Sequence, residues 1–214
     1  MEARAHWFLE KAFSLGALKL GEFRTRAGRT SPYFFNITAF FQGRDFAELS
    51  DALAEMIRDA GVGFDGVFGP AYKGLFMASA VAMAFGEKNI PFCSLRKEEK
   101  TRGERGLWLG VPPSGRVLLV DDVLSAGTSF GKAVAAISAC GARPVVLAVA
   151  LDREEKNLEG KLARDALESS GVRVLSLARL SDVKTYLLEK GETKMLDAIT
   201  AYERLWGDDG AKSR

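Results

Sequence analysis

The sequence predicts an α/β fold in which a mostly parallel central sheet is flanked by helices, and two observations lead to this prediction. Runs of β-branched and leucine residues, such as Val117–Val120, are typical of strands buried on both faces of a parallel sheet. Such runs are followed by a turn and then by a helix-like segment, the order expected of strand–turn–helix units. With 214 residues, the chain is expected to form one domain.

Composition and charge narrow the class of protein. Apolar residues make up 47% of the chain and charged residues 27%, which is ordinary for a globular protein. A formal net charge of +2 gives no support for a nucleic-acid or membrane partner. Cys93 and Cys140 form no disulfide framework, and neither a signal-peptide pattern nor a run of transmembrane length is present. A cytoplasmic location is therefore expected.

The first part of the chain predicts two amphipathic helices separated by a pair of short strands. The helices are expected at Glu2–Ser14 and Gly43–Gly61, where apolar residues recur at helical spacing. Between them, Gly21–Asn36 predicts two strands around a basic turn. The adjacent aromatic residues Tyr33–Phe35 cannot all face one side of a strand, so at least one ring is predicted to meet a ligand or a partner.

A first strand–turn–helix unit is predicted from a strand at Gly66–Gly69, a turn at Pro70–Gly74 and a helix at Leu75–Phe85. The glycines and the proline permit an unusual backbone path in the turn. Lys73 lies next to the helix start, where the helix dipole disfavours a cation. An anionic ligand would account for this lysine, and an exposed surface lysine is the alternative.

A long charged segment, Arg96–Gly106, follows the predicted strand Pro91–Leu95. It is punctuated by glycine, so a solvated surface loop or linker is one interpretation. A loop of this length inside a compact domain is usually functional, and a mobile basic loop suits the closure of a site over an anionic leaving group. Both interpretations remain open on the residues alone.

The stretch Val117–Ser129 carries the strongest signal for function. A buried strand ends in Asp121 and Asp122, and a turn of small and hydroxyl residues leads into a predicted helix at Gly131–Cys140. The turn and the helix start offer N–H groups that suit a phosphate, whereas paired carboxylates suit the vicinal hydroxyls of a sugar. This indicates a pocket for ribose 5-phosphate, with an ordinary capped turn as the alternative.

The rest of the chain predicts further elements of the same kind. Asp152 and Arg153 lie at the carboxyl end of a predicted strand. They either border the same crevice as the turn after Asp122 or form a turn ion pair with each other. The expected elements are the strands Pro144–Leu151 and Val172–Leu177 and the helices Lys161–Ser169, Leu180–Glu189 and Thr193–Trp206, followed by a polar tail.

The pattern at Val117–Ser129 closely resembles the phosphoribosyl pyrophosphate signature of the type I phosphoribosyltransferase family. Nearly the whole chain resembles the orotate-using branch of that family, above all at Gly28–Asn36, Phe68–Gly74, Arg96–Lys100 and Leu151–Arg153. The resemblance implies the type I fold, with a small hood formed largely by residues 1–42, a core at 43–178 and C-terminal helices at 179–206. It also implies Mg²⁺ and the transfer of ribose 5-phosphate to orotate, giving orotidine 5′-monophosphate and diphosphate in pyrimidine biosynthesis.

The resemblance also implies roles for individual residues. Phe34 and Phe35 would flank orotate, and Ser125 and Arg153 would recognise its polar edge and carboxylate. Lys73, Lys100, Arg102, Asp121 and Asp122 would form the catalytic set. Phosphoribosyl pyrophosphate would contact Arg26, Tyr72, Lys73, Arg96, Lys97, Lys100, Arg102, Asp121, Asp122, Val123, Leu124, Ser125, Ala126, Gly127, Thr128 and Ser129.

In the family, loop residues reach the neighbouring subunit, so the resemblance implies a homodimer with shared sites. No protein ligand for a metal is implied, because Mg²⁺ would be held mainly through phosphoribosyl pyrophosphate. Two positions depart from the family pattern: Arg26 stands for a usual lysine and Arg102 for a usual histidine. Arginine keeps the charge but does not give up a proton near neutral pH, so proton transfer at these positions is in question.

Two alternative functions share the same signature. A purine or uracil phosphoribosyltransferase would keep Val117–Ser129, but the aromatic strand and Arg153 favour a carboxylated base. A regulator that binds phosphoribosyl pyrophosphate without turnover could lose the charged loop or gain a DNA-binding module. This chain keeps the loop and has no room for such a module.

Overall fold

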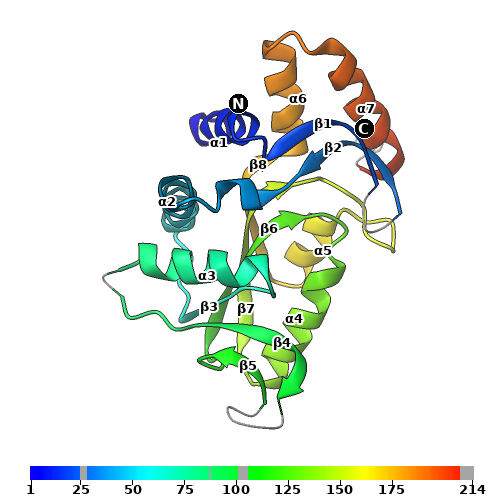
Figure 1. Cartoon of the computed structure of the whole chain (residues 1–214). Helices are drawn as coiled ribbons and strands as arrows, with labels where there is room; N and C mark the ends of the chain where they lie inside the picture. The colour runs from blue at the N-terminus through cyan, green and yellow to red at the C-terminus, as the bar shows by residue number, and fades with distance from the viewer. Residues whose placement is uncertain (25–27, 87, 101–105, 208–214) are drawn as a thin grey trace.

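The computed structural model describes residues 1–24, 28–86, 88–100 and 106–207 (Figure 1). Its centre is a six-stranded sheet in the order β5-β4-β3-β6-β7-β8, in which every neighbouring pair is parallel except β4 with β5. The strands are β3 (Gly66–Phe68), β4 (Phe92–Lys100), β5 (Gly106–Gly110), β6 (Arg116–Leu124), β7 (Arg143–Asp152) and β8 (Arg173–Arg179). The predicted mostly parallel sheet is therefore confirmed.

Helices cover both faces of this sheet because its strands are apolar on both faces. Leu118 and Val120 of β6 pack into the core shared with α2 and α3, whereas Val117 and Leu119 pack into the core beneath α4 and α5. This is the burial pattern of a central parallel strand. The helices of these two layers are α2 (Gly43–Asp59), α3 (Lys73–Ala84), α4 (Thr128–Ala139) and α5 (Ala163–Ser169).

The first and the last described helices lie at the same end of the molecule (Figure 1). An antiparallel pair of strands, β1 (Leu18–Arg24) and β2 (Thr30–Phe35), is followed by the short 3-10 helix η1 (Ile37–Phe40). Helix α7 (Thr193–Trp206) packs against β2, while α1 (Ala3–Ser14) packs against β8 and α6 (Leu180–Glu189). In the part of the chain that the structure describes, no helix is long and apolar enough to cross a bilayer.

All the predicted helices and strands are present, but several of their ends differ. Strand β6 continues beyond Val120 to Leu124, so the acidic pair lies within the strand, and α4 begins at Thr128 rather than at Gly131. Two elements were not predicted: η1 and β5.

The largest difference concerns the predicted loop at Arg96–Gly106. Its first half is the end of β4, which continues to Lys100 and pairs with the antiparallel edge strand β5. The many charged side chains of this segment led to the prediction of a loop. The segment is a strand because it pairs with β5 at the edge of the sheet, where charged residues are common. The rest of the predicted loop, residues 101–105, lies outside the described residues.

Candidate active site

The last residues of β6 carry two adjacent carboxylates, Asp121 and Asp122. Both are held in the strand by pairing with β7, in which Asp121 lies opposite Val149. Asp122 is buried and Asp121 is half-buried, and the backbone N–H of Asp122 donates to Oδ1 of Asp121 over 2.9 Å. Buried carboxylates are costly unless they are partnered, so this pair favours a neighbouring cation or a ligand rich in hydroxyl groups.

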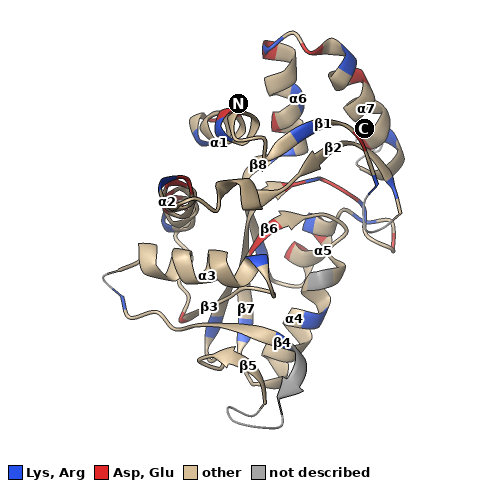
Figure 2. Cartoon of the chain, in the orientation of Figure 1, with Lys and Arg blue, Asp and Glu red and all other residues tan. Residues whose placement is uncertain are grey.

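Lys73, the first residue of α3, supplies a cation at this point. Its ammonium group forms an ion pair with Oδ2 of Asp122. Figure 2 shows the basic start of α3 beside the acidic end of β6. The side chain of Lys73 is still 41% exposed, so it remains accessible to an anionic ligand. The sequence left open whether Lys73 meets an anionic ligand or is a surface lysine; the contact with Asp122 was not predicted, and binding of an anionic ligand by Lys73 stays a prediction.

Asp121 has an unusual electrostatic environment. Burial raises the pKa of Asp121 well above its ordinary value, and the charge on Asp122 raises it further. The N–H of Asp122 and the ammonium of Lys73 act in the opposite direction. A ligand that donates hydrogen bonds to Asp121 would stabilise its charged form, which is what a sugar diol offers.

The turn between β3 and α3 depends on two glycines that touch each other. A Cβ on Gly69 would lie 1.9 Å from the carbonyl oxygen of Gly74, and one on Gly74 would lie 2.5 Å from Cδ of Pro70. The peptide bond between Ala71 and Tyr72 is cis. This packing brings the start of α3 against the backbone of β6, where a Cβ on Gly74 would lie 3.0 Å from the carbonyl oxygen of Val120.

A three-residue turn, Ser125–Gly127, joins β6 to α4. Gly127 has φ +74°, a left-handed conformation that favours glycine, and it caps α4 without any side-chain hydrogen bond. The first N–H groups of this twelve-residue helix therefore lack a side-chain cap, and they lie next to the exposed residues Ser125 and Thr128. This arrangement suits a phosphate group.

The two phenylalanines predicted to flank the base lie on opposite faces of β2. Phe34 is 44% exposed, with its ring 5.4 Å from that of Phe23. Phe35 is buried, and its ring meets that of Phe8 edge-on. Strand alternation imposes this division, so the ring of Phe34 is accessible to a ligand and the ring of Phe35 is part of the core.

Arg153 follows β7 at the same end of the sheet. Its backbone N–H donates to the carbonyl oxygen of Leu124 over 2.9 Å, which joins it to the end of β6. Its guanidinium is buried against Ser31 and forms an ion pair with Glu155. The turn ion pair considered between Asp152 and Arg153 is therefore not the one that forms, because Asp152 pairs with Arg164. Sequence reasoning missed the other partner of this arginine, Tyr202, because nothing local joins positions 49 residues apart.

Asp152 and Arg153 have different environments although they are neighbours. Asp152 is buried in an ion pair with Arg164 at 2.8 Å, and Arg164 also bonds to Val174 and Ser176 of β8. Asp152 therefore fastens α5 to the sheet. The carboxylate of Asp152 is thus used within the fold, whereas the guanidinium of Arg153 is bonded to Ser31, Glu155 and Tyr202.

For the other residues predicted to bind a ligand, the structure gives only single contacts or burial, and some of them are not described. Arg96 donates from Nε to the carbonyl oxygen of Trp108 over 3.3 Å, and Tyr72 is 65% exposed. Val123 is half-buried and Leu124 is a core residue, so the predicted ligand contact with Leu124 would have to be made through its backbone. Outside the described residues or side chains lie Arg26, Lys97, Lys100, Arg102 and Ser129.

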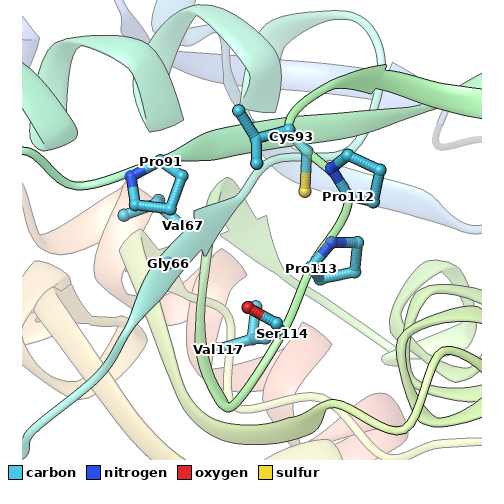
Figure 3. Close-up of a pocket in the computed structure, with 9 residues that line it drawn as sticks. Gly66, Val67, Pro91, Cys93, Pro112, Pro113, Ser114 and Val117 are labelled. Carbon is cyan, nitrogen blue, oxygen red and sulfur yellow. The ribbon is translucent and has the colours of Figure 1, made fainter.

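A small cavity lies at the opposite end of the sheet (Figure 3). Its walls come from the starts of β3, β4 and β6 and from the segment before β6, and they are mostly apolar. In α/β sheets of this kind ligands bind at the carboxyl ends of the strands, so this cavity is not the candidate site. It is lined by Gly66, Val67, Pro91, Cys93, Val111, Pro112, Pro113, Ser114 and Val117.

The fold is α/β. The acidic pair Asp121–Asp122, Lys73 and the uncapped start of α4 together form a site suited to a phosphorylated sugar. A family model of the phosphoribosyl transferase domain matches residues 37–172. The orotate phosphoribosyltransferase of Herminiimonas arsenicoxydans is 42% identical over 212 residues, which cover 94% of this chain and 96% of that protein. The orotate phosphoribosyltransferase of Pectobacterium carotovorum is 43% identical over 212 residues, covering 97% and 100%.

Solved structures agree with these relatives. The crystal structure of orotate phosphoribosyltransferase from Francisella tularensis matches with a TM-score of 0.81 at 30% identity, covering 94% of this chain and 100% of that one. The chain therefore belongs to the phosphoribosyltransferase family and, within it, to the orotate phosphoribosyltransferases.

Proposed function

We propose that this chain transfers ribose 5-phosphate from 5-phospho-α-D-ribose 1-diphosphate (PRPP) to orotate, giving orotidine 5′-monophosphate and diphosphate in pyrimidine biosynthesis. The observation that carries the proposal is the convergence of Lys73, the Asp121–Asp122 pair and the open start of α4 at the carboxyl end of β6. These groups match the diphosphate, the ribose hydroxyls and the 5-phosphate of PRPP, respectively.

The proposed roles at PRPP follow from this match. Asp121 and Asp122 accept from the ribose 2′- and 3′-hydroxyls, and the turn Ser125–Gly127 with Thr128 and Ser129 holds the 5-phosphate. Tyr72 and Lys73 meet the diphosphate, together with the basic residues Arg26, Arg96, Lys97, Lys100 and Arg102.

The proposed base site lies between β2 and the end of β7. Phe34 offers an exposed ring, Ser125 a hydroxyl, and Arg153 a guanidinium for the carboxylate or a carbonyl of orotate. The hood of residues 1–42 would cover this side of the core at 43–178, with the helices at 179–206 beside it.

Catalysis would rest on positioning and charge. A ring nitrogen of orotate attacks the anomeric carbon as the bond to diphosphate breaks, and no covalent nucleophile is required. Lys73 and the basic residues of the β4–β5 hairpin stabilise the negative charge that develops on the leaving diphosphate. Arg26 and Arg102 serve as fixed charges rather than as proton donors.

The acidic pair fits a Mg²⁺ ion that arrives with PRPP. Mg²⁺ prefers one or two carboxylates together with substrate phosphates to a cage made only of protein. Within the described residues there is no group of three or more His, Cys, Asp or Glu side chains that could hold a metal by themselves. When bound, the ion would neutralise part of the diphosphate charge.

We also propose a homodimer with shared sites, formed through α3. Tyr72, Phe76 and Met83 are 65%, 53% and 70% exposed, and their spacing places them on one stripe of the helix. Helix α3 is apolar on its buried and exposed sides alike, which is typical of a helix covered on both sides. The stripe starts next to Lys73, so a second copy that covered it would border the site.

One assay tests the activity. The purified chain is incubated with PRPP, Mg²⁺ and one base at a time, and the loss of orotate absorbance is followed beside reactions with uracil and purine bases. Turnover of orotate alone is expected. Turnover of another base instead would replace the substrate, and PRPP binding without turnover of any base would indicate a regulator.

A further inference from the structure

A buried polar cluster lies where three segments far apart in the sequence meet. These are β2, the segment after β7 and the end of α7, which lie together in Figure 1. The members of the cluster that make hydrogen bonds to one another are Arg29, Ser31, Arg153, Glu155 and Tyr202.

The guanidinium of Arg153 is fixed along two of its edges. Nε donates to Oε1 of Glu155 over 2.6 Å, and Nη2 donates to Oγ of Ser31 over 3.1 Å and to the hydroxyl of Tyr202 over 3.2 Å. The ring of Tyr33 lies 4.3 Å from the guanidinium carbon. The planar guanidinium of Arg153 therefore has little freedom to rotate, because hydrogen bonds hold Nε and Nη2 and an aromatic ring covers one face.

The remaining nitrogen of the guanidinium, Nη1, is available to a ligand. In the described part of the chain, Nη1 of Arg153 makes no hydrogen bond. The buried side-chain atoms there that lack a partner are the hydroxyls of Tyr33 and Ser94, and Nη1 is not among them. Nη1 therefore keeps access to solvent, on a residue whose backbone is bonded to Leu124, just before the proposed phosphate turn.

Glu155 is in turn held by two other groups. The hydroxyl of Tyr202 donates to Oε1 over 2.7 Å, and Nη1 of Arg29 donates to Oε2 over 3.1 Å. Glu155 is only 5% exposed, so its carboxylate has little freedom to turn away. The orientation of Arg153 is therefore set by Glu155, and that of Glu155 partly by the C-terminal helix.

We propose that Glu155 and Tyr202 are positioning residues that hold Arg153 so that Nη1 meets the acceptor groups of the base. This inference rests on the proposed function, which places Arg153 at orotate. It makes α7 part of the base-binding half of the site, although Tyr202 itself does not touch the substrate. The ligand class is a planar heterocycle that carries a carboxylate or carbonyl acceptor.

Four variants test the proposal: Glu155→Gln, Tyr202→Phe, Arg153→Gln and the double variant Arg153→Gln/Glu155→Gln. Glu155→Gln is expected to raise the KM for orotate about tenfold to a hundredfold, the effect of losing one hydrogen bond to a charged group. Tyr202→Phe removes a neutral hydroxyl and is expected to raise it about two- to tenfold. The KM for PRPP should stay within about twofold, because the phosphate turn and the acidic pair are untouched.

The double variant separates positioning from a merely structural brace. If Glu155 acts through Arg153, the double variant should have the same KM for orotate as Arg153→Gln alone, because the second change has nothing left to position. Additive effects on that KM, or equal rises in the KM values for orotate and PRPP, would overturn the proposal. If Glu155→Gln does not fold, the same comparison is made between Arg153→Gln/Tyr202→Phe and Arg153→Gln alone.

A matched control lies on the same helix. Glu203→Gln removes the ion pair with Lys184 at 2.5 Å, one residue from Tyr202, and should leave both KM values unchanged. The wild-type chain is measured on orotate in the same assay. Failure of the wild type to use orotate would overturn the proposed function, whereas an active wild type with an unchanged KM in Glu155→Gln and Tyr202→Phe would overturn the positioning role alone.

Discussion

The ammonium group of Lys73 and the carboxylate of Asp122 form an ion pair that joins the first residue of α3 to the carboxyl end of β6. The contact links two strand–turn–helix units that are 49 residues apart in the sequence. It holds a lysine where the helix dipole disfavours one. In the proposed function, a diphosphate group would bind this lysine in place of Asp122.

Replacing Lys73 by glutamine tests that site. Lys73→Gln is expected to lower kcat/KM for PRPP about a hundredfold to a thousandfold, as the loss of a donor to developing charge does in other enzymes. Steady-state kinetics with varied PRPP measure the effect. The exposed Lys88, beyond the end of α3, provides the control Lys88→Gln. Comparable activity in the two variants would remove Lys73 from the proposed machinery.

Asp121 is expected to cost stability in exchange for function. Because burial and then the charge of Asp122 raise its pKa, the folded chain keeps this proton to a higher pH than the unfolded chain does. The free energy of unfolding therefore falls as pH rises from the ordinary Asp range, about 4, through the raised pKa, and this loss is complete above it.

The variant Asp121→Asn removes that titration. At neutral pH it should be more stable than the wild type by about 0.5–2 kcal/mol, while its activity falls strongly. Urea unfolding across a pH series measures the difference, which should grow from acid to neutral pH. The exposed Asp51→Asn on α2 is the control and should show no such growth. A destabilised Asp121→Asn would mean that the charged form is already well compensated in the free chain.

Gly69 tests the packing of the β3–α3 turn. Gly69→Ala would place a Cβ 1.9 Å from the carbonyl oxygen of Gly74 and 2.8 Å from Cβ of Ala78, so the turn must move. We expect a loss of about 1–3 kcal/mol in the free energy of unfolding and reduced PRPP binding, measured by denaturant unfolding and by titration calorimetry. Gly43→Ala is the control, because its Cβ would meet nothing within 4 Å. Normal PRPP binding by Gly69→Ala would show that the turn tolerates displacement.

Local sequence patterns were sufficient to predict most of the fold. The amphipathic period of α2 and the apolar run of β6 identify these elements without any tertiary information. Strand β5 could not be found in this way, because Leu107 and Leu109 are exposed and only pairing with β4 makes the segment a strand. The acidic pair was predicted at the end of the strand, whereas β6 continues two residues further to Leu124, since the pairing of this segment with β7 is likewise tertiary.

The candidate site was predictable only where its residues are neighbours in the sequence. The acidic pair, the small-residue turn and Lys73 each belong to a local motif. The surroundings of Arg153 do not, because Ser31 lies 122 residues away from it and Tyr202 lies 49 residues away. The division of Phe34 and Phe35 between surface and core follows from strand alternation, but which of the two faces outward depends on the packing of Phe8.

The proposed dimer surface predicts an effect of charge on α3. Phe76→Glu places a carboxylate on the exposed apolar stripe and should raise the dimer dissociation constant about tenfold or more, with a parallel loss of activity. Sedimentation velocity over a range of concentrations measures both species. Leu188→Glu, at a site on α6 that is 62% exposed, is the control. An unchanged dissociation constant in Phe76→Glu would place the interface elsewhere.

Shared sites predict a particular pattern of complementation between defective subunits. Lys100→Ala alone should lower turnover strongly while the fold stays intact, because its proposed role is charge at the diphosphate. Heterodimers that pair a Lys100→Ala subunit with an Asp121→Asn/Asp122→Asn subunit should regain about half of the wild-type activity, since one site then receives both an intact Lys100 and an intact acidic pair. Two affinity tags isolate these heterodimers.

The reverse arrangement of the same substitutions is the control. A subunit that carries Lys100→Ala, Asp121→Asn and Asp122→Asn together is paired with a wild-type subunit. If Lys100 acts across the dimer, each of the two sites in this heterodimer contains one defect, and activity should be nearly absent. If each subunit works alone, this heterodimer keeps about half of the activity, because its wild-type subunit has an intact site. The heterodimer of Lys100→Ala with Asp121→Asn/Asp122→Asn is then inactive, because each of its subunits carries a defect. The comparison therefore decides between shared and separate sites without any need to know how far a loop moves.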